Sequence, residues 1–159
     1  MKIFIYVTLA IAFISCHTTK KMRTTDTAAL AVTDKAIVIS MKKTMCYGQC
    51  PVYEVEIYND RMAKYKGEKT VDNVGEFTAT VPEERYNTLL EQFKNARFFE
   101  FKKEYRAPVS DLPTTYLFFS YEGKSKKVMD YYGAPESLKA LENLVAELVN
   151  ELEWKKLKE

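Results

Sequence analysis

The chain has 159 residues, of which 47% are hydrophobic and 13% aromatic, and this composition excludes an intrinsically disordered protein. Its 24 basic and 22 acidic residues give a net charge of +2, so no overall field favours nucleic acid or an acidic substrate. The length allows one domain with a single core.

The first sixteen residues have the pattern of a lipoprotein signal. Lys2 supplies a positive charge, and residues 3–14 are almost entirely apolar. A stretch of about a dozen apolar residues is too short to span a bilayer but fits a secretory signal. Residues 13–16 (Phe-Ile-Ser-Cys) resemble a bacterial lipobox, in which cleavage precedes a cysteine that carries the lipid. We therefore predict a signal peptide over residues 1–15 and lipidation of Cys16; a cleaved signal without lipid or an uncleaved anchor are the alternatives.

Residues 16–34 predict a flexible tether, because they are rich in Thr, Ala and Lys and contain no aromatic residue. His17 follows Cys16, where an acidic residue would signal retention in the inner membrane. We therefore expect the protein to be anchored in the outer membrane and to face the periplasm.

The next segments predict an antiparallel meander, because short β-branched and alternating runs are separated by turn residues. Strands are expected over residues 36–41, 52–58, 62–66 and 75–81. The second strand alternates between an apolar and a polar side, formed by Tyr53, Val55 and Ile57 and by Glu54, Glu56 and Tyr58, respectively. Such alternation is typical of a sheet with one buried face.

After Pro82 the apolar period changes to that of a helix, which we expect to end near Asn95. Phe98, Phe99 and Phe101 predict a short extended piece, and residues 102–113 predict a loop. A second hairpin is expected over residues 114–121 and 124–132, followed by a helix from residue 136 with the apolar stripe Leu138, Leu141, Val145, Leu148 and Leu152.

The predicted order is ββββαββα, which indicates an α+β fold: an antiparallel sheet, made of the meander and the second hairpin, with two helices packed on one face. We assign the domain to residues 35–154 and a charged C-terminal tail to residues 155–159.

Cys46 and Cys50 enclose Tyr-Gly-Gln and precede Pro51. In an extended chain the two cysteines would lie about 13 Å apart, so a bridge requires Gly48 to close a tight turn. An exported chain with one such pair favours a structural disulfide. A catalytic redox pair, a metal site and two free thiols are alternatives, but the spacing differs from the usual redox motif and too few ligands accompany the pair for zinc.

Other candidate residues lie in loops. Asp111 could cap a turn before the second hairpin. Tyr131 and Tyr132 at the end of that hairpin, together with Tyr47 and Tyr58, could form an aromatic patch for a peptide or glycan. The single histidine, His17, lies in the tether, so no Ser-His-Asp or Cys-His arrangement is available to the folded domain. We predict no catalytic residues, no metal and no cofactor.

Three motifs together resemble the domain-of-unknown-function family 6438: Cys-x-x-x-Cys-Pro-x-Tyr at residues 46–53, Asp-Leu-Pro-Thr-Thr at 111–115 and Asp-Tyr-Tyr-Gly-Ala-Pro-Glu at 130–136. Arg61 departs from the family, in which Gly is common at this turn. The resemblance covers about residues 35 to 150 and implies a bacterial envelope lipoprotein, with no activity to transfer.

The leading hypothesis from the sequence is a non-catalytic envelope lipoprotein, anchored through Cys16, that binds an envelope protein, peptide or glycan and no nucleic acid. A thiol-based redox or metal-binding role at Cys46 and Cys50 is the alternative, and an inhibitor or accessory subunit of an envelope enzyme is another. The Cys46–Pro51 and Ala107–Thr115 loops and the corner at residues 131–133 are expected to carry the binding function if they gather at one end of the domain.

Overall fold

The structure is a computed structural model that describes residues 34–158. The predicted signal peptide, the lipidation site Cys16 and the tether up to residue 33 lie outside the described residues. Among residues 34–158, no helix has the length and apolar character needed to cross a membrane.

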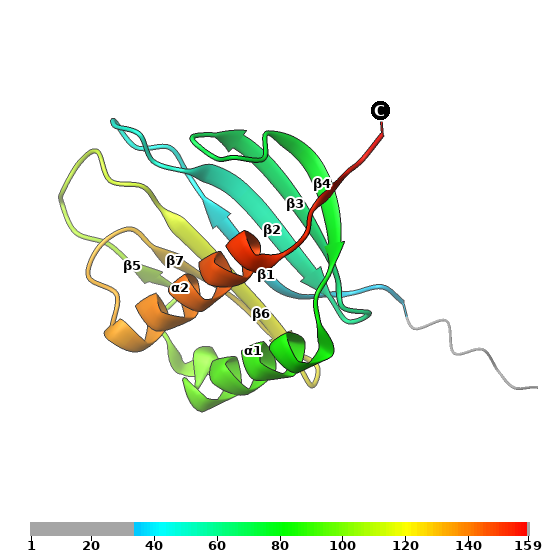
Figure 1. The fold of residues 1–159 in the computed structure, drawn as a ribbon. Helices are drawn as coiled ribbons and strands as arrows, with labels where there is room; N and C mark the ends of the chain where they lie inside the picture. Colours follow the sequence, from blue (N-terminus) through cyan, green and yellow to red (C-terminus); the bar gives the residue numbers. More distant parts are fainter. Residues whose placement is uncertain (1–33, 159) are drawn as a thin grey trace, which may run out of the picture. The chain divides into compact units, whose positions relative to one another are not determined.

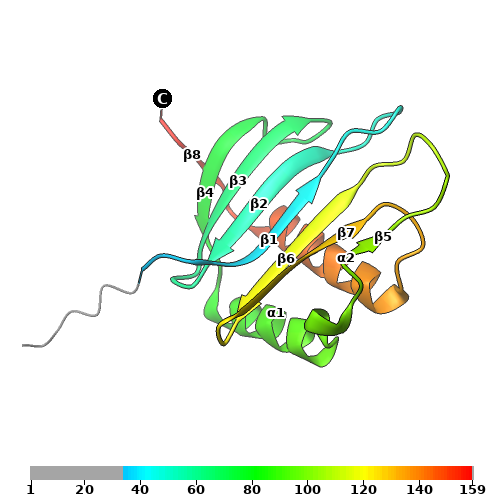
Figure 2. The ribbon, with the colours of Figure 1, turned by 180° about the vertical axis from the view of Figure 1, so that it is seen from behind.

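The described chain forms one sheet of eight strands, two α-helices and one short 3-10 helix (Figures 1 and 2). The strands are β1 (Ile37–Lys43), β2 (Val52–Tyr58), β3 (Met62–Lys69), β4 (Gly75–Thr80), β5 (Glu104–Tyr105), β6 (Thr115–Tyr121), β7 (Lys124–Asp130) and β8 (Lys155–Lys156). The helices are α1 (Glu83–Asn95), η1 (Phe98–Glu100) and α2 (Glu136–Glu151).

The strand order across the sheet is β5-β7-β6-β1-β2-β3-β4-β8. All pairings are antiparallel except that of β5 with β7, which is parallel. The α+β class is therefore confirmed, and the predicted meander and hairpin meet where β1 pairs with β6, with Lys43 opposite Thr115.

Three short segments differ from the prediction. Phe98–Glu100 forms a 3-10 helix instead of an extended piece, because Arg97 adopts a left-handed conformation with φ of 54° and turns the chain after α1. β5 lies within the predicted loop, and β8 lies within the predicted charged tail. β8 pairs with the edge of β4, where the Leu157 amide donates to the Glu76 carbonyl at 2.9 Å.

The core lies between the sheet and the two α-helices, which are in front of the sheet in Figure 1 and behind it in Figure 2. The predicted inward side of β2 is confirmed, since Val55 and Ile57 are fully buried. Phe93 of α1 contacts Phe98 and Phe119, with ring centroids 5.3 and 5.0 Å away. Side chains of η1 therefore fill the core between α1 and β6.

The two ends of the sheet differ. One end, here called the loop end, carries the β1–β2 loop (44–51), the β3–β4 turn (70–74), the β5–β6 loop (106–114) and the β7–α2 corner (131–135). The chain reaches β1 at the opposite end (Figure 2), where the side chain of Asn59 accepts from the Ala36 amide and donates to the Asp34 carbonyl, each at 3.2 Å.

Candidate functional site

The loop end carries most of the exposed large hydrophobic side chains. Eight such side chains are found among residues 34–158, and six lie in the four segments of the loop end. These six are Met45, Tyr47, Val74, Val109, Leu112 and Tyr132. Tyr47 is the most exposed, at 92%. Met45, Tyr47, Val109, Leu112 and Tyr132 are called the loop-end patch below.

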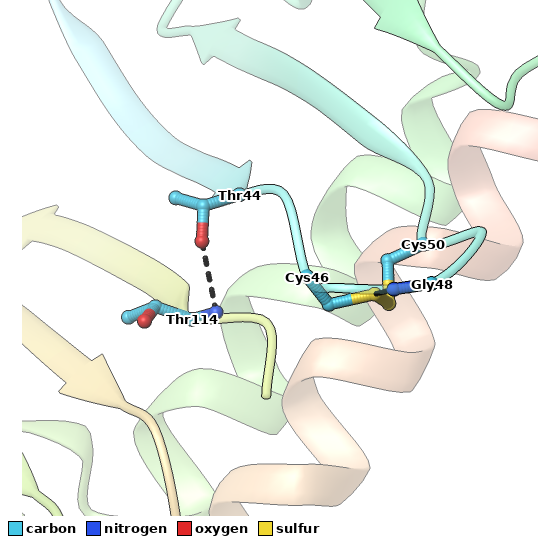
Figure 3. Close-up of a disulfide and its surroundings, with 5 residues drawn as sticks. All are labelled: Thr44, Cys46, Gly48, Cys50 and Thr114. Atoms are coloured by element: carbon cyan, nitrogen blue, oxygen red, sulfur yellow. Dashed lines mark hydrogen bonds between the residues drawn. A yellow bond between two sulfur atoms is a disulfide. The ribbon is translucent and has the colours of Figure 1, made fainter. Parts of the chain in front are cut away.

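Hydrogen bonds join the segments that carry this patch. The Thr44 amide donates to the Thr114 carbonyl at 3.0 Å, and the Thr114 amide donates to Thr44 Oγ1 at 2.9 Å (Figure 3). The Tyr131 hydroxyl donates to the Val109 carbonyl at 2.8 Å. The structure thus brings the three predicted loop segments to one end of the domain.

The β1–β2 loop is closed by a disulfide between Cys46 and Cys50, whose Cα atoms lie 5.7 Å apart (Figure 3). The backbone amide of Gly48 also approaches Cys46 Sγ at 3.2 Å. Tyr47 therefore projects from a ring of five residues, whose conformational freedom is much reduced. In this bridged state, neither sulfur is a free thiol.

The other sequence-predicted residues have different positions at the loop end. Tyr132 is exposed, whereas Tyr131 is half-buried and uses its hydroxyl to hold the β5–β6 loop. Asp111 is exposed in a left-handed conformation with φ of 69°, and its carboxylate accepts from the Ser110 hydroxyl at 3.1 Å. Tyr131 and Asp111 thus make contacts within the loops, whereas Tyr47 and Tyr132 are exposed to solvent.

The sequence analysis missed a buried ion cluster that consists of Asp130, Glu142 and Lys139. Asp130, the last residue of β7, is 2% exposed, and Glu142 of α2 is 5% exposed. Lys139 forms ion pairs with both carboxylates, and its Nζ lies 3.6 Å from Glu142 Oε2. Among the described residues, Oδ1 of Asp130 and Oε1 of Glu142 have no hydrogen-bond partner. The cluster joins α2 to the strand that leads directly into Tyr131 and Tyr132.

Burial raises the pKa of Glu142 to about 7, with Lys139 opposing this rise and Asp130 adding to it. Burial alone would lower the pKa of Lys139, but its contacts with Asp130 and Glu142 outweigh this effect and raise it. Lys43 of β1 also faces the cluster, and burial lowers its pKa while Glu142 acts in the opposite direction. The cluster can therefore exchange a proton near neutral pH at Glu142.

The sequence contains a signal for both carboxylates. In β7, Val128 and Asp130 are two residues apart and so occupy the same face of the strand. In α2, Glu142 follows Leu138 by four residues and precedes Val145 by three, which places it within the apolar stripe. An acidic residue at a position where the strand or helix period predicts an apolar side chain indicates a buried charge.

These features define a small α+β domain with one mostly antiparallel sheet, a disulfide-closed loop and several exposed apolar side chains at one end. In residues 34–158, no group of three or more His, Cys, Asp and Glu side chains is arranged to hold a metal ion. The chain belongs to the domain-of-unknown-function family DUF6438, whose model matches residues 37–149. No curated protein matches the chain.

Proposed function

We propose that the protein is a lipoprotein of the bacterial envelope, anchored through Cys16, whose loop-end patch binds a segment of another envelope protein without catalysing a reaction. The observation that carries this proposal is the gathering of exposed apolar side chains on loops that are fastened to one another.

The composition of the patch favours a protein or peptide partner over a glycan. Tyrosine offers a large contact area with few rotatable bonds and is frequent at binding hot spots. Met45, Val109 and Leu112 add aliphatic surface, which suits apolar side chains of a peptide. Because the disulfide already restricts Tyr47, less conformational entropy is lost when a partner orders this loop.

The position of the chain's first described residues supports the same function. Asp34 and Ala36 are fastened at the end of the sheet opposite the loop end. A tether that continues from there to a lipid on Cys16 would leave the loop end accessible to partners on the side away from the attachment point. In our proposal this attachment is to the outer membrane, and the domain faces the periplasm.

The proposal is tested by capture from detergent-solubilised envelope with the tagged, lipidated chain. The variant Tyr47→Ser with Tyr132→Ser is compared with the control Met62→Ser with Leu157→Ser, which removes two exposed apolar side chains outside the loop end. We expect the same specific partner with wild type and control, and a loss of at least about tenfold with the tyrosine variant. Equal capture by both variants would refute the role of the patch.

A further inference from the structure

We propose that the pocket between the end of α2 and the β3–β4 turn binds the free carboxylate end of a peptide with an apolar C-terminal residue. This inference goes beyond the proposed function, because the pocket uses none of the side chains of the loop-end patch.

The pocket has a volume of about 520 Å³, which is within the range of sites for small ligands and for the last residues of a peptide. Its lining comes from β1, β2, the β3–β4 turn and the C-terminal half of α2. Segments far apart in the chain thus form one concavity on the helix side of the sheet.

Lys43 supplies the positive charge of the pocket. Its side chain is half-buried, and its Nζ lies 6.0 Å from the centre of the Tyr53 ring. Among residues 34–158, Lys43 makes no ion pair within 4.0 Å, in contrast to Lys139 of the buried ion cluster. Burial lowers the pKa of Lys43, and Glu142, whose charge opposes this fall, forms no ion pair with Lys43 within 4.0 Å. An anionic ligand group would supply the missing direct partner.

Contacts with neighbouring groups hold the apolar part of the lining. Trp154 donates from its indole Nε1 to the Val149 carbonyl at 2.8 Å, and its ring lies 5.1 Å from that of Tyr65. Tyr53, which is 7% exposed, and Val71 also line the pocket. These side chains offer an apolar surface for the terminal residue of a ligand without first having to be ordered.

The charges and amides of the pocket favour a peptide carboxylate over a phosphate. Lys43 carries one positive charge, whereas the exposed Asp72 adds a negative charge at the pocket lining and so opposes a dianion. Asn73 and Asn150 also line the pocket, and their amides can donate to and accept from a peptide backbone.

The test uses the chain's single tryptophan, Trp154, as a fluorescent reporter, with heat of binding as a second readout. The probes are the peptide acetyl-Ala-Ala-Gly-Leu with a free carboxylate, the same peptide with a C-terminal amide, and octanoate. We expect saturable binding of the free acid and at least about tenfold weaker binding of the amide, because a charge-assisted contact is lost. Equal binding of acid and amide, no binding of the acid, or tighter binding of octanoate would overturn the proposal.

Two lysine variants locate the charge. Lys43→Met keeps an unbranched side chain, one atom shorter, and removes the charge. It should weaken binding of the free acid at least about tenfold and make it equal to binding of the amide. Lys42→Met removes the neighbouring lysine, which is exposed and paired with Glu54 at 3.3 Å, and should leave binding unchanged. Equal weakening by both would overturn the assignment to Lys43. The variant Tyr47→Ser with Tyr132→Ser leaves the pocket lining intact. A failure of the pocket to bind the peptide can therefore be distinguished from a failure of the loop-end patch to bind its partner.

Discussion

Asp130 and Glu142 are two buried carboxylates that share one counterion, the ammonium group of Lys139. Asp130 ends β7, and Glu142 lies on α2, so the shared lysine joins the sheet to the helix across the β7–α2 corner. Tyr131 and Tyr132 immediately follow Asp130. The cluster therefore lies directly beside the segment that carries Tyr132 of the loop-end patch.

The first prediction concerns the pH dependence of stability. Because the folded-state pKa of Glu142 is about 7 and its ordinary value is 4.5, the folded state keeps a proton that the unfolded chain releases in this interval. The free energy of unfolding should therefore fall as pH rises from 4.5 to 7, by at most about 3 kcal/mol from this group. Glu142→Gln should remove this fall, as measured by urea unfolding at several pH values.

Glu147→Gln is the matched control for that experiment, because Glu147 is an exposed residue of the same helix. Its pH profile should follow that of wild type. If the free energy of unfolding of wild type rises from pH 5 to pH 7 in parallel with that of Glu142→Gln, the raised pKa of Glu142 is contradicted.

Lys139→Met should destabilise the domain because it leaves the two carboxylates without their shared cation. Since the Lys139 side chain is 43% exposed, we expect a loss of about 1–3 kcal/mol, below that of a fully buried pair. The loss should be larger at pH 8, where Glu142 is ionised, than at pH 5. Lys124→Met, at the exposed first residue of β7, is the control, and an equal loss at both pH values would argue against the cluster.

The disulfide should contribute modestly to stability. Peptide mapping without reductant should recover Cys46 joined to Cys50. Replacement of both by Ser should lower the free energy of unfolding by about 2 kcal/mol, which is several degrees in Tm for a domain of this size. Alkylation of both thiols in unreduced envelope material would instead favour the thiol-based alternative.

Lipidation is predicted at Cys16, outside the described residues. Cys16→Ala should leave the protein unprocessed or release it from the membrane fraction. Mass spectrometry of the mature N-terminal peptide should show a lipid on wild type. A fully soluble wild type whose N-terminal peptide has no added mass would refute the anchor, without bearing on the fold of residues 34–158.

The main helices and strands could be predicted because their apolar periods are regular. The two-residue strands β5 and β8 could not be predicted, because they form only by pairing with the backbone of β7 and β4, respectively. Lys155 and Lys156 resemble a solvated tail in sequence, but their backbone pairs with Phe77 and Thr78. No local pattern specifies such a contact.

Tyr58 shows why a side chain assigned to the open face can nevertheless be buried. The alternation of β2 places it on the solvent side, as predicted, yet it is only 8% exposed. The ammonium groups of Lys35 and Lys64 lie 4.6 and 5.5 Å from its ring centre, and its hydroxyl donates to Glu56. Long polar neighbours cover the ring, an effect that alternation alone does not predict.

Photo-cross-linking in intact cells tests the central claim most directly. A benzophenone amino acid is placed at position 47 or 132 in the loop-end patch, or at position 62 near the opposite end of the sheet. The account predicts one discrete adduct with an envelope protein from positions 47 and 132, and none from position 62. Adducts from position 62 alone, or equal labelling from all three positions, would contradict it.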